Sequence, residues 1–176
     1  MTNKELIERY PFLIPRNVWS GKIVENYDYN NPDYTLLDDM PEGWRKAFGE
    51  QICEEIRDEL IKAQERDPEG GYDDGDTVIP YLQGYYPIQI KEKYGQLRWY
   101  DNGYPKDSKI YDIINKYEKI SERVCIKCGK PAAWMSTGWI SPWCDDCKSH
   151  VADKFVPIDE WFEEDNEEEC ESCKLF

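Results

Sequence analysis

Two closely spaced pairs of cysteines constrain this chain more than any other feature of its sequence. The pairs span residues 125–128 and 144–147, and fifteen residues separate them. A Cys-x-x-Cys turn directs both sulfurs toward one point, and two such turns at this separation bring four sulfurs into a tetrahedron. The predicted ligands are Cys125, Cys128, Cys144 and Cys147. The sequence therefore predicts one structural Zn²⁺ ion.

The residues around the cysteines predict a zinc ribbon over residues 125–152. Gly129 follows the first pair and permits the positive φ of a tight turn. Aromatic residues on either side of Thr137-Gly138 predict a short hairpin between the two zinc turns. Because four thiolates leave no open coordination position, we expect the zinc to be structural rather than catalytic.

The remaining cysteines and the one histidine leave alternatives open. An iron–sulfur cluster also uses four cysteines, although this spacing differs from ferredoxin motifs. Disulfides are a further alternative, but an odd count of seven cysteines favours metal binding in a reducing compartment. His150 is expected to be a surface residue and Cys53 a small buried residue. Cys170 and Cys173 form either a reducible thiol pair or a weak second metal site.

Hydrophobic periodicity predicts a long helix before the cysteines. Five large apolar side chains recur at every fourth position between residues 41 and 63, and charged residues occupy the other side. This spacing places the apolar side chains on one face of a helix. They are Trp44, Phe48, Ile52, Ile56 and Leu60. A short helix is also expected over residues 3–10, and a surface loop over residues 64–76.

A hairpin and a second helix are expected between the long helix and the cysteines. Apolar and polar residues alternate over 88–91 and 97–100, on either side of Lys93-Tyr94-Gly95. Ser108 is the predicted N-cap of a helix whose apolar residues run to Ile120. We therefore predict an α+β fold with a small helix-hairpin-helix body at residues 1–124, a C-terminal four-cysteine zinc ribbon at 125–152 and an acidic tail at 153–176.

The overall charge favours a basic partner. The chain has 37 acidic and 22 basic residues, a formal net charge of -15. Such a charge opposes contact with nucleic-acid phosphates or an anionic membrane, so neither is an expected partner.

No apolar run approaches the roughly 20 residues of a membrane span, and the N-terminus lacks the apolar core of a signal peptide. We therefore expect a cytoplasmic protein.

The acidic segment that follows the ribbon has two interpretations. Nine carboxylates and no Lys or Arg lie between residues 157 and 171. Such a run is typical of a solvated tail that keeps a protein in solution. It is also suited to an interaction surface, because an aromatic anchor beside dense negative charge can hold a basic groove. The candidate partner-binding residues are Trp161, Glu163, Glu164, Glu167, Glu168 and Glu169.

Several of these segments together resemble a family of small phage and prophage proteins. The shared features are a Gly-Trp pair at the start of a helix, a Lys-Glu-Lys-aromatic-Gly-x-Leu-Arg-aromatic-Tyr strand motif, a second helix and a zinc ribbon. Here they are Glu42-Gly43-Trp44, residues 90–100, Cys125-x-x-Cys128-Gly129, and Gly138-Trp139-Ile140 before Cys144-x-x-Cys147. The resemblance covers residues 42–147 and implies phage origin and a zinc ion, with no particular activity.

A narrower resemblance is to the type II-A anti-CRISPR proteins, which are phage inhibitors of Cas9. It rests on small size and negative charge, which suit a target with a positively charged nucleic-acid channel. It implies a non-enzymatic inhibitor that acts in the bacterial host cell, binds a basic host protein such as Cas9 and blocks DNA loading.

Two other functions are alternatives. A nucleic-acid-binding or transcription-associated zinc ribbon would use the basic and aromatic residues near the zinc turns. These are Lys127, Lys130, Trp139 and Trp143. An enzyme would need a catalytic pair among the many carboxylates, because the chain has one histidine and no Gly-rich phosphate loop. Net acidity opposes the first alternative and the absence of motifs opposes the second, so we expect no enzyme.

Overall fold

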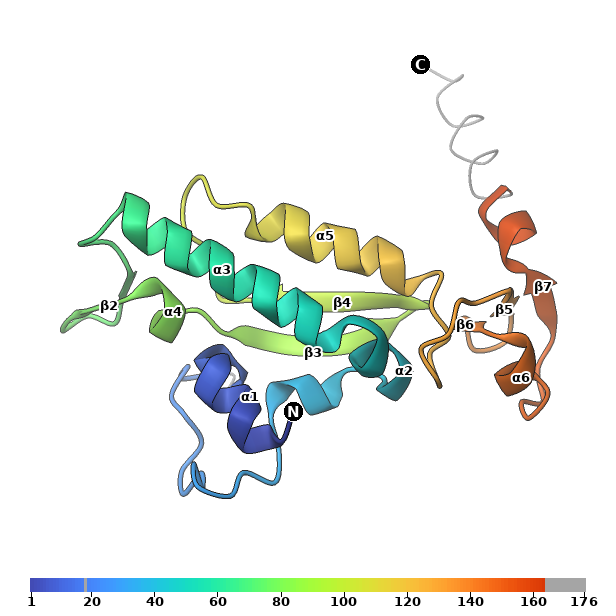
Figure 1. The fold of residues 1–176 in the computed structure, drawn as a ribbon, viewed down its shortest axis with the longest axis horizontal. Helices are drawn as coiled ribbons and strands as arrows, with labels where there is room; N and C mark the ends of the chain where they lie inside the picture. The colour runs from blue at the N-terminus through green and yellow to red at the C-terminus, as the bar shows by residue number, and fades with distance from the viewer. Residues whose placement is uncertain (18, 164–176) are drawn as a thin grey trace, which may run out of the picture.

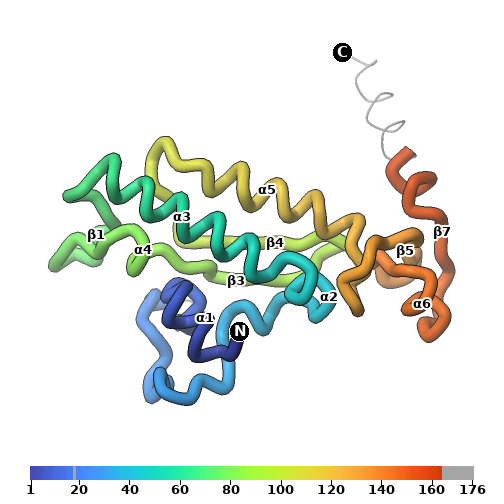
Figure 2. Tube along the Cα trace, in the orientation of Figure 1, coloured from blue at the N-terminus to red at the C-terminus, as the bar shows by residue number. Residues whose placement is uncertain are grey.

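The structure is a computed structural model that describes residues 1–17 and 19–163. It contains both helices and small antiparallel sheets, which confirms the predicted α+β class. Helices α3 (Glu50–Arg66) and α5 (Ile110–Ser121) lie beside each other along the hairpin of β3 (Pro87–Lys93) and β4 (Gln96–Asp101) (Figure 1). The segment that contains the paired cysteines lies at one end of this body (Figure 2).

The predicted long helix is present but contains a wider turn. It runs without a break through α2 (Glu42–Trp44), the π-turn η3 (Arg45–Gly49) and α3. Apolar residues at a strict spacing of four drift by about 40° per step on an α-helix of 3.6 residues per turn. The π-turn has more residues per turn and takes up part of this drift. As a result all five predicted apolar residues are buried: Trp44, Phe48, Ile52, Ile56 and Leu60.

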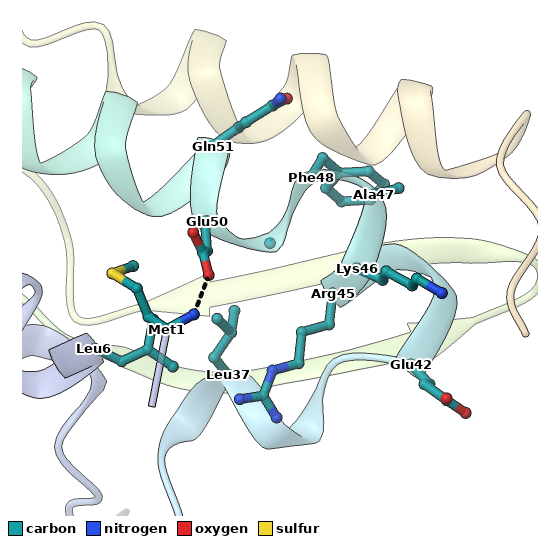
Figure 3. Close-up of a pocket in the computed structure, with 11 residues that line it drawn as sticks. Met1, Leu6, Leu37, Glu42, Arg45, Lys46, Ala47, Phe48, Glu50 and Gln51 are labelled. Carbon is teal, nitrogen blue, oxygen red and sulfur yellow. Dashed lines mark hydrogen bonds and ion pairs between the residues drawn. The ribbon is translucent and has the colours of Figure 1, made fainter. Parts of the chain in front are cut away.

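The π-turn borders a cavity of about 520 Å³ (Figure 3). The terminal ammonium of Met1 lies 3.1 Å from Glu50 Oε1 in this cavity. Arg45 points from the same turn toward Asp38, with which it forms an ion pair. These ion pairs join the N-terminal segment to the long helix.

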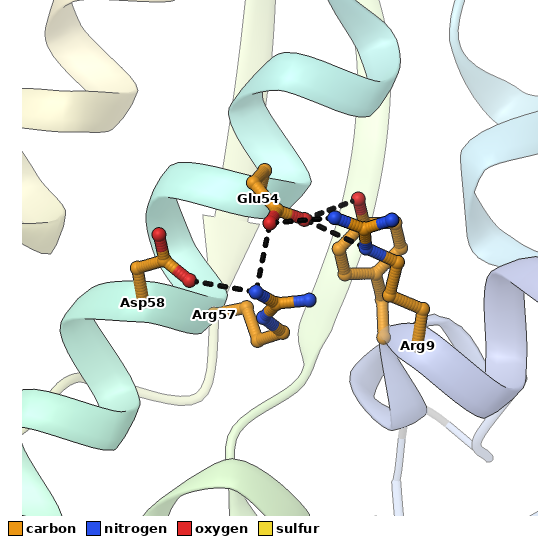
Figure 4. A network of polar contacts seen from close by, with 5 residues as sticks. Arg9, Glu54, Arg57 and Asp58 are labelled. Carbon is orange, nitrogen blue, oxygen red and sulfur yellow. Dashed lines mark hydrogen bonds and ion pairs between the residues drawn. The ribbon is translucent and has the colours of Figure 1, made fainter.

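The N-terminal segment covers one side of the hydrophobic core. Helix α1 (Asn3–Arg9) begins with a capping box between Thr2 and Glu5, and it confirms the helix predicted over residues 3–10. The short helices η1 (Pro11–Leu13) and η2 (Leu36–Asp39) follow. Arg9 donates two hydrogen bonds to the Glu54 carboxylate, which Arg57 also contacts at 2.7 Å (Figure 4).

The predicted hairpin is confirmed and has one buried and one polar face. Tyr94 and Gly95 form its turn with φ of 56° and 78°, and positive φ at both positions matches the twist of a two-residue hairpin. Ile90 faces Trp99 across the strands, and both side chains are buried. The alternate residues of both strands therefore lie on the opposite face.

The predicted cap of the second helix is wrong. Helix α5 begins at Ile110 with Lys109 at the N-cap position, and no side chain of its own caps it. The backbone N–H of Lys109 donates instead to Glu59 Oε1 of α3 at 3.3 Å, while the Ser108 hydroxyl is buried without a partner. A contact from the neighbouring helix thus replaces the local cap.

The segment after the long helix folds back on the body. Strands β1 (Tyr72–Asp73) and β2 (Val78–Ile79) form a two-residue ladder, and α4 (Tyr81–Gly84) follows them. The predicted loop over residues 64–76 therefore includes the end of α3 and the first strand of this ladder.

The C-terminal sheet has the order β6-β5-β7. Its strands are β5 (Trp134–Ser136), β6 (Ser141–Trp143) and β7 (Phe155–Pro157). The short helix α6 (Asp145–Lys148) lies between β6 and β7 in the sequence.

Within the described ranges, no helix is both long enough and apolar enough to cross a membrane.

Candidate metal centre

The structure brings the four predicted cysteines together. Cys125 and Cys128 lie in the turn after α5, Cys144 occupies the N-cap position of α6 and Cys147 lies within that helix. Their four sulfur atoms all lie within 4.8 Å of one another, and Cys128 Sγ is 3.5 Å from Cys144 Sγ. Four convergent sulfurs at these separations are positioned to bind one metal ion.

Backbone geometry in the first turn explains the glycine after Cys128. Gly129 has φ of 80°, as predicted, and its N–H donates to the Cys125 carbonyl at 3.0 Å. The Cys125 N–H donates in turn to the Lys130 carbonyl at 2.8 Å. A Cβ at Gly129 would lie 2.6 Å from the Gly43 carbonyl oxygen. Glycine is therefore needed for its conformation and for its contact with the long helix.

The thiols of this cluster differ in their acidity. The pKa of Cys128 falls to about 7, chiefly because the backbone N–H of Lys130 hydrogen-bonds its sulfur. Burial raises the pKa of Cys144 and of Cys147, and for Cys147 the neighbouring thiols add to the rise. Four thiolates at this separation repel one another, and a divalent cation would offset that repulsion. Metal binding would therefore release protons.

The sheet beside the cysteines includes a strand from the segment predicted to be the acidic tail. The β5–β6 hairpin around Thr137-Gly138 confirms the predicted hairpin between the two cysteine turns. Strand β7 pairs with the other edge of β5, with Met135 opposite Val156. The boundary predicted after residue 152 therefore separates β7 from the sheet to which it belongs. A periodicity argument could not find this strand because it is only three residues long.

With β7 included, the ribbon comprises residues 125–157. It is joined to the start of the long helix. The Gly43 N–H donates to the Ile126 carbonyl and the Trp44 indole N–H donates to the Val124 carbonyl, both at 2.9 Å. A Cβ at Gly43 would overlap the carbonyl oxygens of Cys125 and Ile126. The Gly-Trp pair was visible in the sequence as part of the family resemblance, but its contact with the ribbon was not.

His150 and Cys53 lie outside the cysteine cluster. His150 is exposed, and its backbone N–H donates to the Cys147 carbonyl at 3.2 Å. Cys53 is fully buried in the body, as predicted, and this burial raises the pKa of its thiol. Cys170 and Cys173 lie outside the described residues.

The candidate partner-binding residues are described only in part. Residues 158–163 are helical, with Trp161 half-buried and Glu163 exposed. Ile158 is buried, and its N–H donates to the Ala133 carbonyl at 3.0 Å. The remaining candidates Glu164, Glu167, Glu168 and Glu169 lie outside the described residues. The acidic segment thus begins directly on the ribbon.

The alternative nucleic-acid face is not a free basic surface. Lys127 Nζ lies 2.8 Å from Glu42 and Lys130 Nζ lies 2.7 Å from Asp146. The Trp143 indole donates to the Ser136 hydroxyl, whereas the Trp139 side chain is exposed. The two lysines therefore face carboxylates instead of presenting unpaired charge.

Comparison with protein-family models, with curated proteins and with solved structures found no match to this chain.

Proposed function

We propose that this chain is a non-enzymatic, zinc-stabilised binding protein whose acidic C-terminal segment engages a basic, nucleic-acid-handling protein. In this proposal the helix-hairpin-helix body of residues 1–124 is the scaffold, and the ribbon fixes the start of the binding segment. The main support for this proposal is that β7 pairs with β5 and is followed directly by the helical residues 158–163, so the start of the acidic segment is attached to the ribbon.

The chemistry of the ligand set supports zinc. Four thiolates form the usual donor set of structural zinc sites, and soft sulfur ligands favour Zn²⁺ over Mg²⁺ or Ca²⁺. The set leaves no position for a reacting water, so the metal would stabilise the ribbon without taking part in a reaction. Catalysis is therefore not part of the proposal.

Contacts of the helical residues 158–163 support an acidic surface that is exposed to a partner. Arg123 binds Asp159 at 3.0 Å, and its guanidinium carbon lies 4.6 Å from the centre of the Phe162 ring. This leaves Glu160 and Glu163 exposed, and neither forms an ion pair among residues 1–17 and 19–163. Two side chains thus hold the turn against the body while its carboxylates remain available to a partner.

The proposed partner class follows from charge. A protein that holds nucleic acid has a positively charged channel, and a negatively charged binder can occupy it and exclude the DNA. Charge complementarity raises association rates by about 10- to 1000-fold at low salt, whereas exposed ion pairs add little to affinity. We propose Cas9 loaded with its guide RNA as the first partner to test.

The experiment measures association with an immobilised Cas9–guide complex at low and high salt. One variant replaces the acidic candidates with Gln at Glu163, Glu164, Glu167, Glu168 and Glu169. Its matched control removes the same charge elsewhere, with amides at the exposed positions Glu8, Glu25, Glu65, Glu69 and Asp76. We expect the first variant to associate more slowly with a weaker salt dependence, and the control to resemble the parent.

A second variant separates the effect on the association rate from the effect on the dissociation rate. Trp161→Ala removes the half-buried ring beside the carboxylates, so it should accelerate dissociation and leave the association rate unchanged. A mobility-shift assay then shows whether the bound protein blocks target DNA. Equal behaviour of the two charge variants would contradict a localised acidic surface. Retention of duplex DNA by the protein alone would favour the nucleic-acid-binding ribbon instead.

A further inference from the structure

The outer face of the β3–β4 hairpin gathers the basic residues of the strand motif. The register places Lys91 opposite Arg98, Gln89 opposite Tyr100 and Lys93 opposite Gln96. These six residues alternate with the buried face that Ile90 and Trp99 share. Three of the six residues are basic, on a chain whose net charge is -15.

We propose that this outer face, with the pocket at its tip, binds a short segment of single-stranded nucleic acid. Lys91 and Lys93 form no ion pair with any carboxylate in the described part of the chain. Arg98 is 29% exposed and lies 3.6 Å from Glu118. Two unpaired ammonium groups on alternate residues of one strand can follow a phosphate backbone.

Exposed aromatic rings lie at the tip and along the same face. The exposed fractions are 72% for Tyr94, 75% for Trp139 and 45% for Tyr100. Lys93 Nζ lies 5.3 Å from the centre of the Tyr94 ring, and Lys91 Nζ lies 5.4 Å from that of Tyr100. Rings beside ammonium groups are the usual elements of single-strand binding, because bases stack on the ring while phosphates contact the charge.

A pocket of about 410 Å³ lies where the body hairpin meets the ribbon hairpin. Its lining residues are Glu92, Lys93, Tyr94, Gly138, Trp139 and Ile140. A Cβ at Gly95 would lie 3.2 Å from Ile140 Cγ2 and 3.3 Å from Met135 Sδ, so the two tips are in contact. A pocket of this volume can accept one unstacked base.

The polar groups around this pocket hold its shape. The Asp153 carboxylate accepts the backbone N–H of Gly138 and of Trp139, at 3.1 and 3.2 Å. The Glu92 carboxylate accepts the Gly95 N–H at 2.7 Å. The loops that carry Tyr94 and Trp139 are therefore fixed before a ligand arrives, which lowers the entropic cost of binding.

The dimensions and the net charge set the expected affinity. Strand β4 has six residues and is about 20 Å long, which suits the lower end of known site sizes, about four nucleotides. The acidic remainder of the chain repels phosphates, but at physiological salt this repulsion is screened beyond about 8 Å. We expect weak binding that involves about three phosphate contacts. The logarithm of the binding constant should then fall with the logarithm of the salt concentration with a slope of about -2.

The test is fluorescence anisotropy of labelled dT12 and rU12 with the full zinc-loaded chain, titrated at several salt concentrations. The charge variant is Lys91→Gln with Lys93→Gln. Its matched control is Lys62→Gln with Lys119→Gln, two exposed lysines on other elements. We expect the charge variant to bind more weakly, with the salt slope reduced by about 1.4. The control should keep the parent's slope.

The aromatic variant is Trp139→Ala, and because this side chain is exposed, we expect the fold to remain intact. We expect a loss of affinity of about 5- to 150-fold with an unchanged salt slope, since one stacking contact is removed and no charge. Metal content and circular dichroism confirm folding of each variant. Absence of binding at low salt, or equal weakening by the control lysines, would overturn the proposal. Tighter binding of a poly-glutamate peptide than of either oligonucleotide would also overturn it.

This inference does not depend on the proposed protein partner, because it concerns other residues and is tested with the chain alone.

Discussion

The body buries its apolar side chains in one core, whereas the ribbon has few to bury. Every residue of the main hydrophobic cluster lies between Leu6 and Tyr117. The buried positions of the ribbon include Cys125, Cys144 and two serines, and Met135 is its one large side chain below 2% exposure. The body can therefore fold by hydrophobic burial, while a metal ion at the four sulfurs would hold the turns of the ribbon.

The two regions nevertheless share one structural element. The start of the long helix contributes Trp44 to the body core and its indole N–H to the Val124 carbonyl. Gly43 packs directly on the cysteine turn. Loss of the metal should therefore reach the first turn of the helix but not its far end, where α3 packs on α5.

The largest expected effect is that of removing a ligand. Cys128→Ser should unfold the ribbon, because apparent binding free energies of structural zinc, about 10–16 kcal/mol, exceed what so small a module can otherwise supply. Hydrogen exchange should show loss of protection over residues 125–157 with retention in α3 and α5. Uniform loss over the whole chain would show that body and ribbon form one cooperative unit.

The next effect concerns the contact between the two regions. Gly43→Ala places a Cβ against two carbonyl oxygens of the cysteine turn and should destabilise the chain by about 1–3 kcal/mol. Urea unfolding of the zinc-bound protein measures this loss. Gly49→Ala is the matched control in the same helix, where the nearest atoms lie 3.3–3.6 Å away on side chains. If both variants have the same stability, Gly43 is not a constrained contact.

The pattern of apolar residues and the spacing of the cysteines predicted the long helix, the hairpin and the second helix of the body, and the whole cysteine cluster. Helical and strand periods are local properties of the sequence. They identify residues such as Ile52 and Trp99 as buried without knowledge of the element that packs against them. The π-turn, β7 and the Glu59 contact that replaces Ser108 were missed. The Glu59 contact depends on residues distant in sequence, and β7 is too short to show a period. The π-turn follows from the strict spacing of four, which an α-helix of 3.6 residues per turn does not match.

A smaller effect should distinguish the pH response of the body from that of the ribbon. The Arg9 guanidinium holds the pKa of Glu54 below its usual range, and Tyr10 and Arg57 add to this effect. A depressed pKa stabilises the fold above the unfolded-state value of about 4.3, and this contribution is lost as the pH falls through the lower folded value.

Glu54→Gln should therefore cost about 1 kcal/mol at pH 7 and nothing at the lowest pH. Urea unfolding at a series of pH values, with both proteins free of zinc, measures this difference. A difference that is the same at pH 7 and at pH 3 would mean that Glu54 acts through packing and not through its charge.

The smallest effect is expected at the exposed ion pair that spans the two regions. Glu42 raises the pKa of Lys127, but both side chains are more than 60% exposed. Lys127→Gln should leave the thermal midpoint and the zinc content unchanged, because solvent screens such pairs. A clear loss of stability would mean that this ion pair, and not Gly43 and Trp44, joins ribbon to body.

Zinc K-edge X-ray absorption on the purified chain, combined with metal analysis, tests the proposed metal centre most directly. We predict one zinc per chain with four sulfur neighbours at about 2.3 Å, and the same spectrum after truncation behind Glu163, which removes Cys170 and Cys173. Less than about half an equivalent of zinc, or nitrogen or oxygen neighbours in the first shell, would contradict the four-thiolate site. A spectrum changed by the truncation would contradict it as well.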